Sequence, residues 1–168
     1  YLHQVGYTKT ILLVENRITM FERKRIQGFQ SATDVKGKEI IDGIVVECGT
    51  ESHQIGEALQ KVLDKYADID SIICTNNVVA YETLKFLKKK NRNVPGDIGI
   101  ITFDNYPLAE YMDPSLTVVD IDTYKLGEEA ANTLFSIIQN PGQHRKEVLL
   151  STRIIEREST MKGEKQKK

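Results

Sequence analysis

Cysteine is scarce in this sequence, whose 168 residues include only Cys48 and Cys74. Two cysteines give no disulfide framework, and there is neither a CxxC pair nor an HExxH motif that would hold a metal ion. His3, His53 and His144 are scattered over segments that we expect to be helix or loop. We therefore expect both thiols to be reduced and buried as small apolar groups, and we expect no metal ion and no cofactor.

An excess of positive charge is missing too, since 23 basic and 24 acidic residues leave a formal net charge of -1. A domain that grips DNA by itself needs a basic face, because neutralised phosphates supply most of the non-specific affinity. We therefore expect that this chain alone does not bind operator DNA with sequence specificity. The basic run from Lys162 to Lys168 is expected to be a disordered, solvated tail.

Long apolar runs and targeting signals are also absent from the sequence. No stretch approaches the roughly 20 apolar residues that span a bilayer, and no signal peptide opens the chain. We expect a cytoplasmic protein that has no membrane partner.

The common motifs of catalysis are absent as well. Glu15-Asn16-Arg17 stands after the first expected strand, where a nucleotide-binding protein would have a glycine-rich phosphate loop. No GxSxG nucleophile elbow is present. We therefore do not expect an enzyme. One alternative stays open, because two carboxylates such as Glu51 and Asp104 can perform acid/base work, as they do in glycosidases.

Short runs of β-branched residues alternate with amphipathic segments along the chain. The runs are nearly continuous rather than alternating, which is typical of strands buried on both faces of a parallel sheet. Strands joined through helices imply right-handed crossovers. The sequence thus predicts an α/β fold with a doubly wound parallel sheet. The expected strands are 10–14, 43–47, 71–75 and 98–103, and the expected helices are 22–33, 55–66, 78–89 and 123–139.

Shorter elements complete the expected fold. Residues 1–6 are interpreted as the end of a helix that Gly6 closes. Residues 105–115 are expected to be a loop around two prolines, and residues 116–119 a short strand. Residues 148–150 and 153–155 are expected to close the fold as a strand pair or as one bent strand.

Polar residues follow each of the four expected strands. Arg25, Glu51, the pair Asn76 and Asn77, and Asp104 come next along the chain. In an open parallel α/β sheet, ligands bind in the crevice outside the carboxyl ends of the strands. The pattern therefore predicts a small-molecule site before any family is considered.

Several short motifs, taken in order, resemble the effector-binding domain of the lactose/galactose repressor (LacI/GalR) family of bacterial transcription regulators. The resemblance covers about residues 1–161, and Tyr7 stands where the family has histidine. The matching segments are 6–11, Arg25-Ile26-Gln27-Gly28-Phe29, 94–98, Phe103-Asp104-Asn105, 114–117, Gly127-Glu128-Glu129-Ala130 and 153–160.

The resemblance implies a periplasmic-binding-protein-like fold, most of it the C-terminal lobe of a two-lobed domain. Residues 1–117 would form that lobe, 118–142 would be a return segment of the N-terminal lobe, and 143–161 would return to the C-terminal lobe before the tail 162–168. The helix-turn-helix head, the hinge helix and the rest of the N-terminal lobe do not appear in this sequence. The helix at 123–139 should therefore expose its apolar face.

The resemblance also suggests roles for individual residues. It implies that Arg25 contacts an effector through its planar fork of donors, and that Asp104 accepts hydrogen bonds from it. Most of the candidates also have a plainer structural interpretation. These are a surface arginine for Arg25, an Asx turn for Asp104, a helix cap for Asn76 and Asn77, an acidic residue before a helix for Glu51, and a core residue for Phe21. The candidate effector-binding residues are Arg25, Asp104, Asn76, Asn77, Glu51, Phe21 and Thr19. Asn77 replaces a usual aspartate, and Glu51 replaces an aromatic residue of some relatives.

We therefore interpret the chain as the effector-sensing part of a bacterial transcription repressor, whose effector is a sugar or another small polar metabolite. DNA would be a partner only through a head absent from this chain, and the family implies a homodimer. Two alternatives stay open: a periplasmic sugar-binding receptor, and a flavodoxin-like or phosphosugar-processing enzyme.

Overall fold

The structure is a computed structural model, and it describes residues 1–16, 19–33, 42–140 and 147–162. Its centre is a six-stranded sheet with the order β2-β1-β3-β4-β5-β6. The first five of these strands are parallel to their neighbours, and β6 pairs antiparallel with β5. The strands are β1 (Lys9–Glu15), β2 (Asp42–Cys48), β3 (Ser71–Cys74), β4 (Gly99–Phe103), β5 (Thr117–Ile121) and β6 (Thr152–Ile155). The predicted mostly parallel α/β sheet is confirmed.

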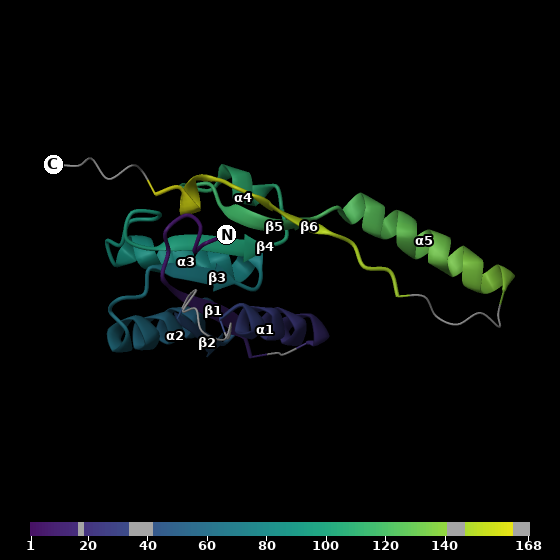
Figure 1. The fold of residues 1–168 in the computed structure, drawn as a ribbon. Helices are drawn as coiled ribbons and strands as arrows, with labels where there is room; N and C mark the ends of the chain where they lie inside the picture. Colours follow the sequence, from purple (N-terminus) through teal and green to yellow (C-terminus); the bar gives the residue numbers. More distant parts are fainter. Residues whose placement is uncertain (17–18, 34–41, 141–146, 163–168) are drawn as a thin grey trace.

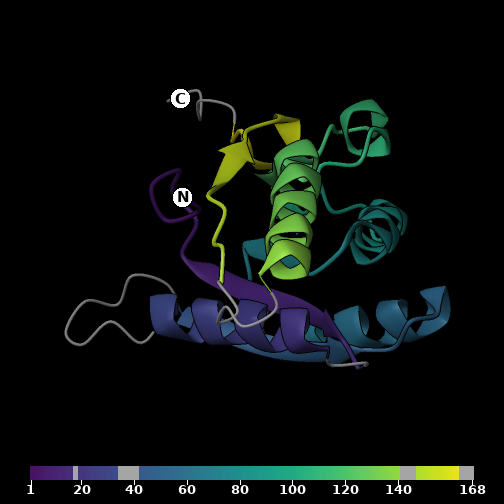
Figure 2. The same cartoon turned by 90° about the vertical axis from the view of Figure 1, so that its right-hand side faces the viewer.

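Helices cover both faces of this sheet. They are α1 (Met20–Thr33), α2 (Ser52–Lys65), α3 (Asn77–Lys89), α4 (Leu108–Tyr111), α5 (Thr123–Gln139) and a short 3-10 turn, η1 (Glu158–Thr160). Figure 2 shows α3 and α4 on one side of the sheet and the N-terminal turn on the opposite side.

The main core lies between the sheet and the helices α2, α3 and α4. Ile11 and Leu13 of β1 belong to it, as do Ile55 and Leu59 of α2 and Leu87 of α3. Side chains alternate between the two faces of a strand. The intervening residues of β1 therefore point to the other face, where α1 contacts β1 and β2.

A second, smaller core fills the other face near β4. It centres on Leu2, Tyr7 and Ile101, and all three side chains are buried. The Tyr7 ring lies over Gly99 so closely that a β-carbon at Gly99 would stand 2.3 Å from the ring. Burial, followed by the nearby Asp70 carboxylate, raises the pKa of Tyr7 to about 12.

The C-terminal segment is fastened to the sheet by hydroxyl groups. The Ser159 hydroxyl donates to the Ile100 carbonyl at 2.6 Å and accepts from the Thr117 amide at 2.8 Å. The Thr160 hydroxyl lies 2.7 Å from that of Thr117. The Glu158 carboxylate accepts hydrogen bonds from the amide and hydroxyl of Ser115, which lowers its pKa. Ser159 and Thr160, which belong to the motif at 153–160, therefore have a structural role, because they hold the C-terminal segment against β4 and β5.

Helix α5 projects away from the rest of the fold, as Figure 1 shows. The Asp122 side chain caps it by accepting from the Lys125 amide at 2.9 Å. None of its residues is buried, and Leu126, Leu134 and Ile137 are respectively 47%, 58% and 43% exposed. The expectation that this helix exposes its apolar face is confirmed.

We expect α5 to be the least stable element of this chain when it is studied alone. An isolated helix shorter than about 15 residues is marginal in water, and α5 is only slightly longer. Its amides should therefore exchange with solvent much faster than those of Ile72 and Ile100 in the core strands. Hydrogen exchange on a monomeric sample measures this difference. Equal protection of α5 and the core strands would contradict the structural account of an unsupported helix.

Among the expectations about short elements, one is confirmed and two are wrong. Residues 1–6 form the last turn of a helix, which Gly6 closes with a positive φ of 88°: the Gly6 amide donates to the His3 carbonyl at 3.0 Å and the Tyr7 amide to the Leu2 carbonyl at 2.9 Å. The expected loop at 105–115 contains α4, which the buried Ala109 anchors to the core. Residues 148–150 form no strand, and β6 begins at Thr152.

The expectation that both cysteines are free and buried is confirmed. Two other expectations concern residues that the structure does not describe. Cys48 and Cys74 are free and buried, and burial raises the pKa of their thiols to about 11 and about 12, respectively. The tail beyond Lys162 and His144 lie outside the described residues.

Candidate functional site

The strand order creates a crevice between β1 and β3. From β1 the chain continues outward to β2, whereas from β3 it continues in the opposite direction to β4. The connections therefore diverge at the carboxyl ends of these neighbouring strands, which is the topological switch point where open α/β sheets bind ligands. Glu15 at the end of β1, Asn76 and Asn77 after β3, and Asp104 after β4 lie together at this edge.

Arg25 reaches this edge from α1. Its guanidinium donates to the carbonyl oxygen of Thr75, the residue after β3. It lies 3.5 Å from the Asp104 carboxylate and 4.3 Å from the centre of the Phe103 ring. Stacking and ion pairing orient the planar fork. The Arg25 side chain is 21% exposed, so it is partly buried at the edge and still reachable from solvent.

Asp104 sits just after β4 with a positive φ of 69°. Its amide donates to the Val119 carbonyl at 3.0 Å, and this bond continues the pairing of β4 with β5. Its carboxylate is 39% exposed and faces Arg25. A non-glycine residue in the left-handed region is uncommon, and such residues concentrate at ligand sites.

Asn76 and Asn77 begin α3 beside Asp104. The Asn76 side chain accepts from the Val79 amide at 3.0 Å and so caps the helix. Its amide nitrogen donates to the Glu15 carboxylate at 2.9 Å. The Asn77 amide nitrogen donates to the carbonyls of Phe103 and Asp104, at 3.0 and 3.1 Å. The two asparagines thus fix the ends of β1, β3 and β4 relative to one another.

A hollow of about 500 Å³ opens beside these residues. Its lining combines polar side chains with aromatic and aliphatic ones. The described residues that line it are Glu15, Asn76, Asn77, Val78, Tyr81, Asp104, Tyr106, Pro107 and Leu108. A concave, largely apolar site with a few fixed polar groups suits a small organic ligand.

Four of the seven candidates do not line this hollow. Arg25 lies next to it through its ion pair with Asp104, and the other three lie elsewhere. Glu51 is exposed and caps α2 in a capping box with Gln54. Thr19 lies before α1, where its hydroxyl donates to Glu22 and lowers the pKa of that carboxyl. Phe21 is 66% exposed, so it is not the core residue that the alternative interpretation described.

Sequence reasoning missed six residues that line the hollow: Glu15, Val78, Tyr81, Tyr106, Pro107 and Leu108. Glu15 carries the same signal as the predicted residues, because it is the last residue of a strand. Tyr81 lies on α3 and Tyr106 in the loop between β4 and α4, and no spacing rule brings the two tyrosines together. They lie close enough that Tyr106, after burial, contributes to raising the pKa of Tyr81.

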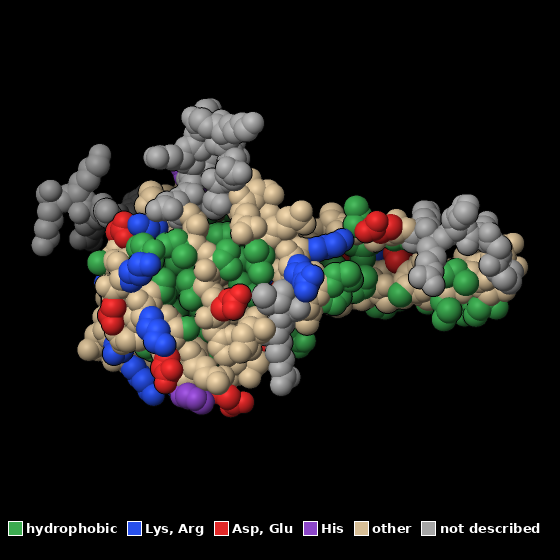
Figure 3. All heavy atoms as spheres, turned by 90° about the horizontal axis from the view of Figure 1, so that it is seen from below, with side chains coloured by type: hydrophobic (Ala, Val, Ile, Leu, Met, Phe, Trp, Pro, Cys, Tyr) green, Lys and Arg blue, Asp and Glu red, His purple; other side chains and the backbone are tan. Residues whose placement is uncertain are grey.

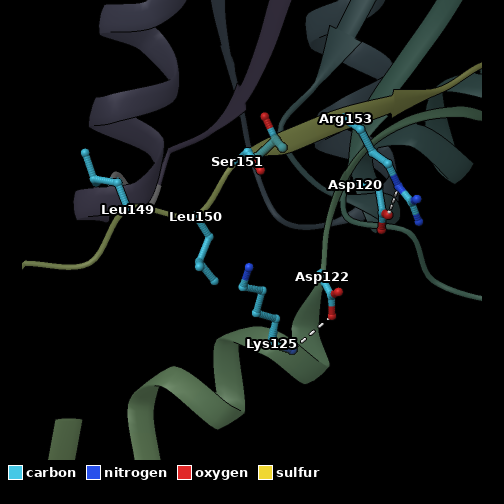
Figure 4. Close-up of a pocket in the computed structure, with 8 residues that line it drawn as sticks. Asp120, Asp122, Lys125, Leu149, Leu150, Ser151 and Arg153 are labelled. Atoms are coloured by element: carbon cyan, nitrogen blue, oxygen red, sulfur yellow. Dashed lines mark hydrogen bonds and ion pairs between the residues drawn. The ribbon is translucent and has the colours of Figure 1, made fainter. Parts of the chain in front are cut away.

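A second hollow, of about 420 Å³, lies at the base of α5. Figure 4 shows Asp122 and Lys125 on one side of it and residues 149–153 on the other. Arg153 donates to the Asp120 carboxylate at 2.9 Å. Leu149 is 82% exposed. This hollow lies between the first turn of α5 and the segment that leads into β6.

Other kinds of site find no support in the part of the chain that the structure describes. No group of three or more histidine, cysteine, aspartate or glutamate side chains is arranged for a metal ion. No described helix is long and apolar enough to cross a membrane. On the face in Figure 3, basic and acidic side chains are interspersed over the sheet domain, and apolar side chains gather along the projecting helix.

Comparisons with known proteins agree with this architecture. A family model described as a periplasmic binding protein-like domain matches residues 1–160. The HTH-type transcriptional regulator MalR of Clostridium butyricum is 30% identical over 135 residues, which are 80% of this chain and 40% of that protein.

Solved structures show the same similarity. A LacI family transcriptional regulator from Enterococcus faecium with bound ribose is 25% identical, with a TM-score of 0.79 over 94% of this chain and 58% of that one. The complex of the transcriptional regulator CelR with cellobiose has a TM-score of 0.81 at 23% identity and covers 94% of this chain and 48% of that one. The chain thus spans about half the length of these proteins. It belongs to the periplasmic binding protein-like family, and its homologues are LacI-family HTH-type transcriptional regulators.

Proposed function

We propose that this chain is the effector-sensing part of a bacterial transcription regulator and that the effector is a sugar or a similar small polyol. The observation that carries the proposal is the Arg25–Asp104 pair, 3.5 Å apart at the switch point of the sheet. The pair presents donors and acceptors side by side in a partly buried place. Paired hydroxyl groups of a sugar require this combination.

The walls of the neighbouring hollow favour the same class of ligand. Tyr81, Val78 and Leu108 offer apolar surface on which the C–H face of a sugar ring packs. Asp104 and Glu15 offer acceptors for its hydroxyl groups. The solved relatives named above hold ribose and cellobiose, which supports a carbohydrate as the effector of this chain.

The proposed mechanism is thermodynamic linkage between two sites. Residues 1–117 and 143–161 would form one lobe of the effector-binding domain, and α5, within the segment 118–142, would pack on a second lobe. Its exposed apolar residues support this assignment. An effector held between the lobes would favour their closed arrangement and so bias the DNA-binding heads of a homodimer. The cytoplasmic location is part of this proposal.

A binding role is favoured over catalysis and over a role in transport. The relatives reported above are transcriptional regulators. Glu51 and Asp104, the carboxylates considered for acid/base work, do not face one hollow, because Glu51 caps α2 elsewhere. A receptor for sugar transport would share the lobe but would have no DNA-binding head.

Isothermal titration calorimetry on the complete gene product tests the proposal. Ribose, cellobiose, lactose and maltose form the first panel, and each is titrated with and without the DNA that lies upstream of the gene. We expect saturable binding of one sugar per chain and a change in DNA affinity when that sugar is present. Sugar binding that leaves DNA affinity unchanged would point to a receptor, and no sugar binding would contradict the proposal.

A further inference from the structure

Glu15 gives the hollow a charge that the proposed function does not explain. Of the described residues that line it, two are carboxylates and none is lysine or arginine. The Asp104 carboxylate is balanced by Arg25 at 3.5 Å. The Glu15 carboxylate forms no ion pair with any residue that the structure describes, and its recorded partner is the neutral amide of Asn76. Among the described residues that line the hollow, no cation therefore balances the Glu15 carboxylate.

The orientation of Glu15 is fixed by a helix cap. The backbone amide of Val79 can only donate, so Asn76 turns its oxygen toward that amide, at 3.0 Å. The nitrogen of the Asn76 side chain must then face Glu15, where it donates to one carboxylate oxygen at 2.9 Å. The second oxygen has no recorded partner within the described ranges and remains available as an acceptor. Changing this arrangement would break the cap of α3, which holds the carboxylate in place.

The remaining walls of the hollow suit a cation. Tyr81 and Tyr106 line it with phenol rings, and the faces of such rings attract a positive charge. Arg25 does not serve as that cation, because its guanidinium is already shared by Asp104, the Thr75 carbonyl and the Phe103 ring. A negatively charged ligand would instead meet Glu15, and none of the described residues that line the hollow would offer it a positive charge.

We propose that Glu15 selects an effector that carries a protonated amine together with hydroxyl groups, an amino sugar in chemical terms, and excludes phosphorylated or carboxylated sugars. This inference rests on the proposed function and narrows its ligand class. The ammonium group lies between the Glu15 carboxylate and the two phenol rings, while the hydroxyl groups bind near Asp104 and Arg25. Glu15 is thus a specificity-determining residue.

Matched sets of sugars test this selection in the complete gene product by calorimetry. Glucose, galactose and mannose are each used as the neutral sugar, the 2-amino sugar and the 6-phosphate. Within the set that binds, we expect the amino sugar to bind about tenfold tighter than the neutral sugar, because a charge-assisted hydrogen bond replaces a neutral one. The 6-phosphate should bind more weakly than the neutral sugar.

The variant Glu15→Gln removes the charge and keeps the acceptor for Asn76. It should reduce the ratio of amino-sugar to neutral-sugar affinity to about one. Glu57→Gln is the matched control, since Glu57 is an exposed carboxylate on α2, outside the hollow. Circular dichroism would show whether Glu15→Gln folds. If it does not fold, the ratio of amino-sugar to neutral-sugar affinity in the unmodified protein still shows whether the site selects an amino sugar.

Other outcomes separate the two proposals. A neutral or phosphorylated sugar that binds at least as tightly as its amino form would overturn the inference, as would an unchanged ratio in folded Glu15→Gln. Binding of ribose or cellobiose in either case would leave the proposed function standing. If 1,4-diaminobutane bound as tightly as the amino sugar, the hydroxyl part of the inference would be wrong. No binding by any sugar would contradict both proposals.

Discussion

Replacing Arg25 with alanine is expected to weaken binding of a sugar effector about 10- to 150-fold. This range corresponds to the roughly 1.5–3 kcal/mol that a charge-assisted hydrogen bond contributes. The variant removes the donors that the ligand would use, and it also leaves the Asp104 carboxylate without its partner at 3.5 Å. Calorimetry on the complete gene product measures the affinity of the strongest-binding sugar of the panel.

Two further variants make the Arg25 result interpretable. Arg23→Ala removes an exposed arginine from the same helix and should leave the affinity unchanged. Arg25→Lys keeps the charge but loses the planar fork, so it should restore only part of the affinity. If Arg25→Ala remained folded by circular dichroism and bound the sugar as tightly as the unmodified protein, Arg25 would be a structural residue only.

Replacing Tyr7 with alanine is expected to destabilise the fold by roughly 3–5 kcal/mol, as large-to-small changes of buried aromatic residues do. The Tyr7 ring is fully buried over Gly99 and belongs to the smaller core with Leu2 and Ile101. The truncation would leave a cavity next to Gly99, which has no side chain to fill it. The midpoint and slope of a urea denaturation curve give the change in unfolding free energy.

Tyr111→Ala serves as the control for this measurement. Tyr111 is 80% exposed, so its loss should change the unfolding free energy by no more than about 0.5 kcal/mol. A Tyr7→Ala protein as stable as the control would show that the N-terminal turn does not pack against β4 in solution.

Elements with a strong local signal could be predicted closely from the sequence. The helix predicted at 123–139 has the same bounds in the structure, because an amphipathic run lies between the Asp122 cap and Asn140. The four-residue helix α4 could not be predicted, since its stability comes from burial of Ala109 and not from its own sequence. Residues 148–150 are apolar enough for a strand, but they have no pairing partner in the described sheet.

The site was only partly predictable for a related reason. Strand ends predicted Asp104 and the asparagines, because carboxyl ends of parallel strands share one edge. Which ends become neighbours depends on the strand order, which is non-local. Glu51 follows β2 at the edge of the sheet, whereas Glu15 is the last residue of β1, beside the switch point. The sequence analysis therefore selected Glu51, and not Glu15, as a candidate effector-binding residue. In the structure only Glu15 lines the hollow.

A crystal structure of the complete gene product with its bound sugar tests the central claim most directly. The account predicts a ligand at the carboxyl edge of the sheet, with the Arg25 guanidinium and the Asp104 carboxylate both within hydrogen-bonding distance of ligand oxygens. A sugar bound instead at the base of α5, beside Asp120 and Arg153, with Arg25 touching only protein groups, would contradict it.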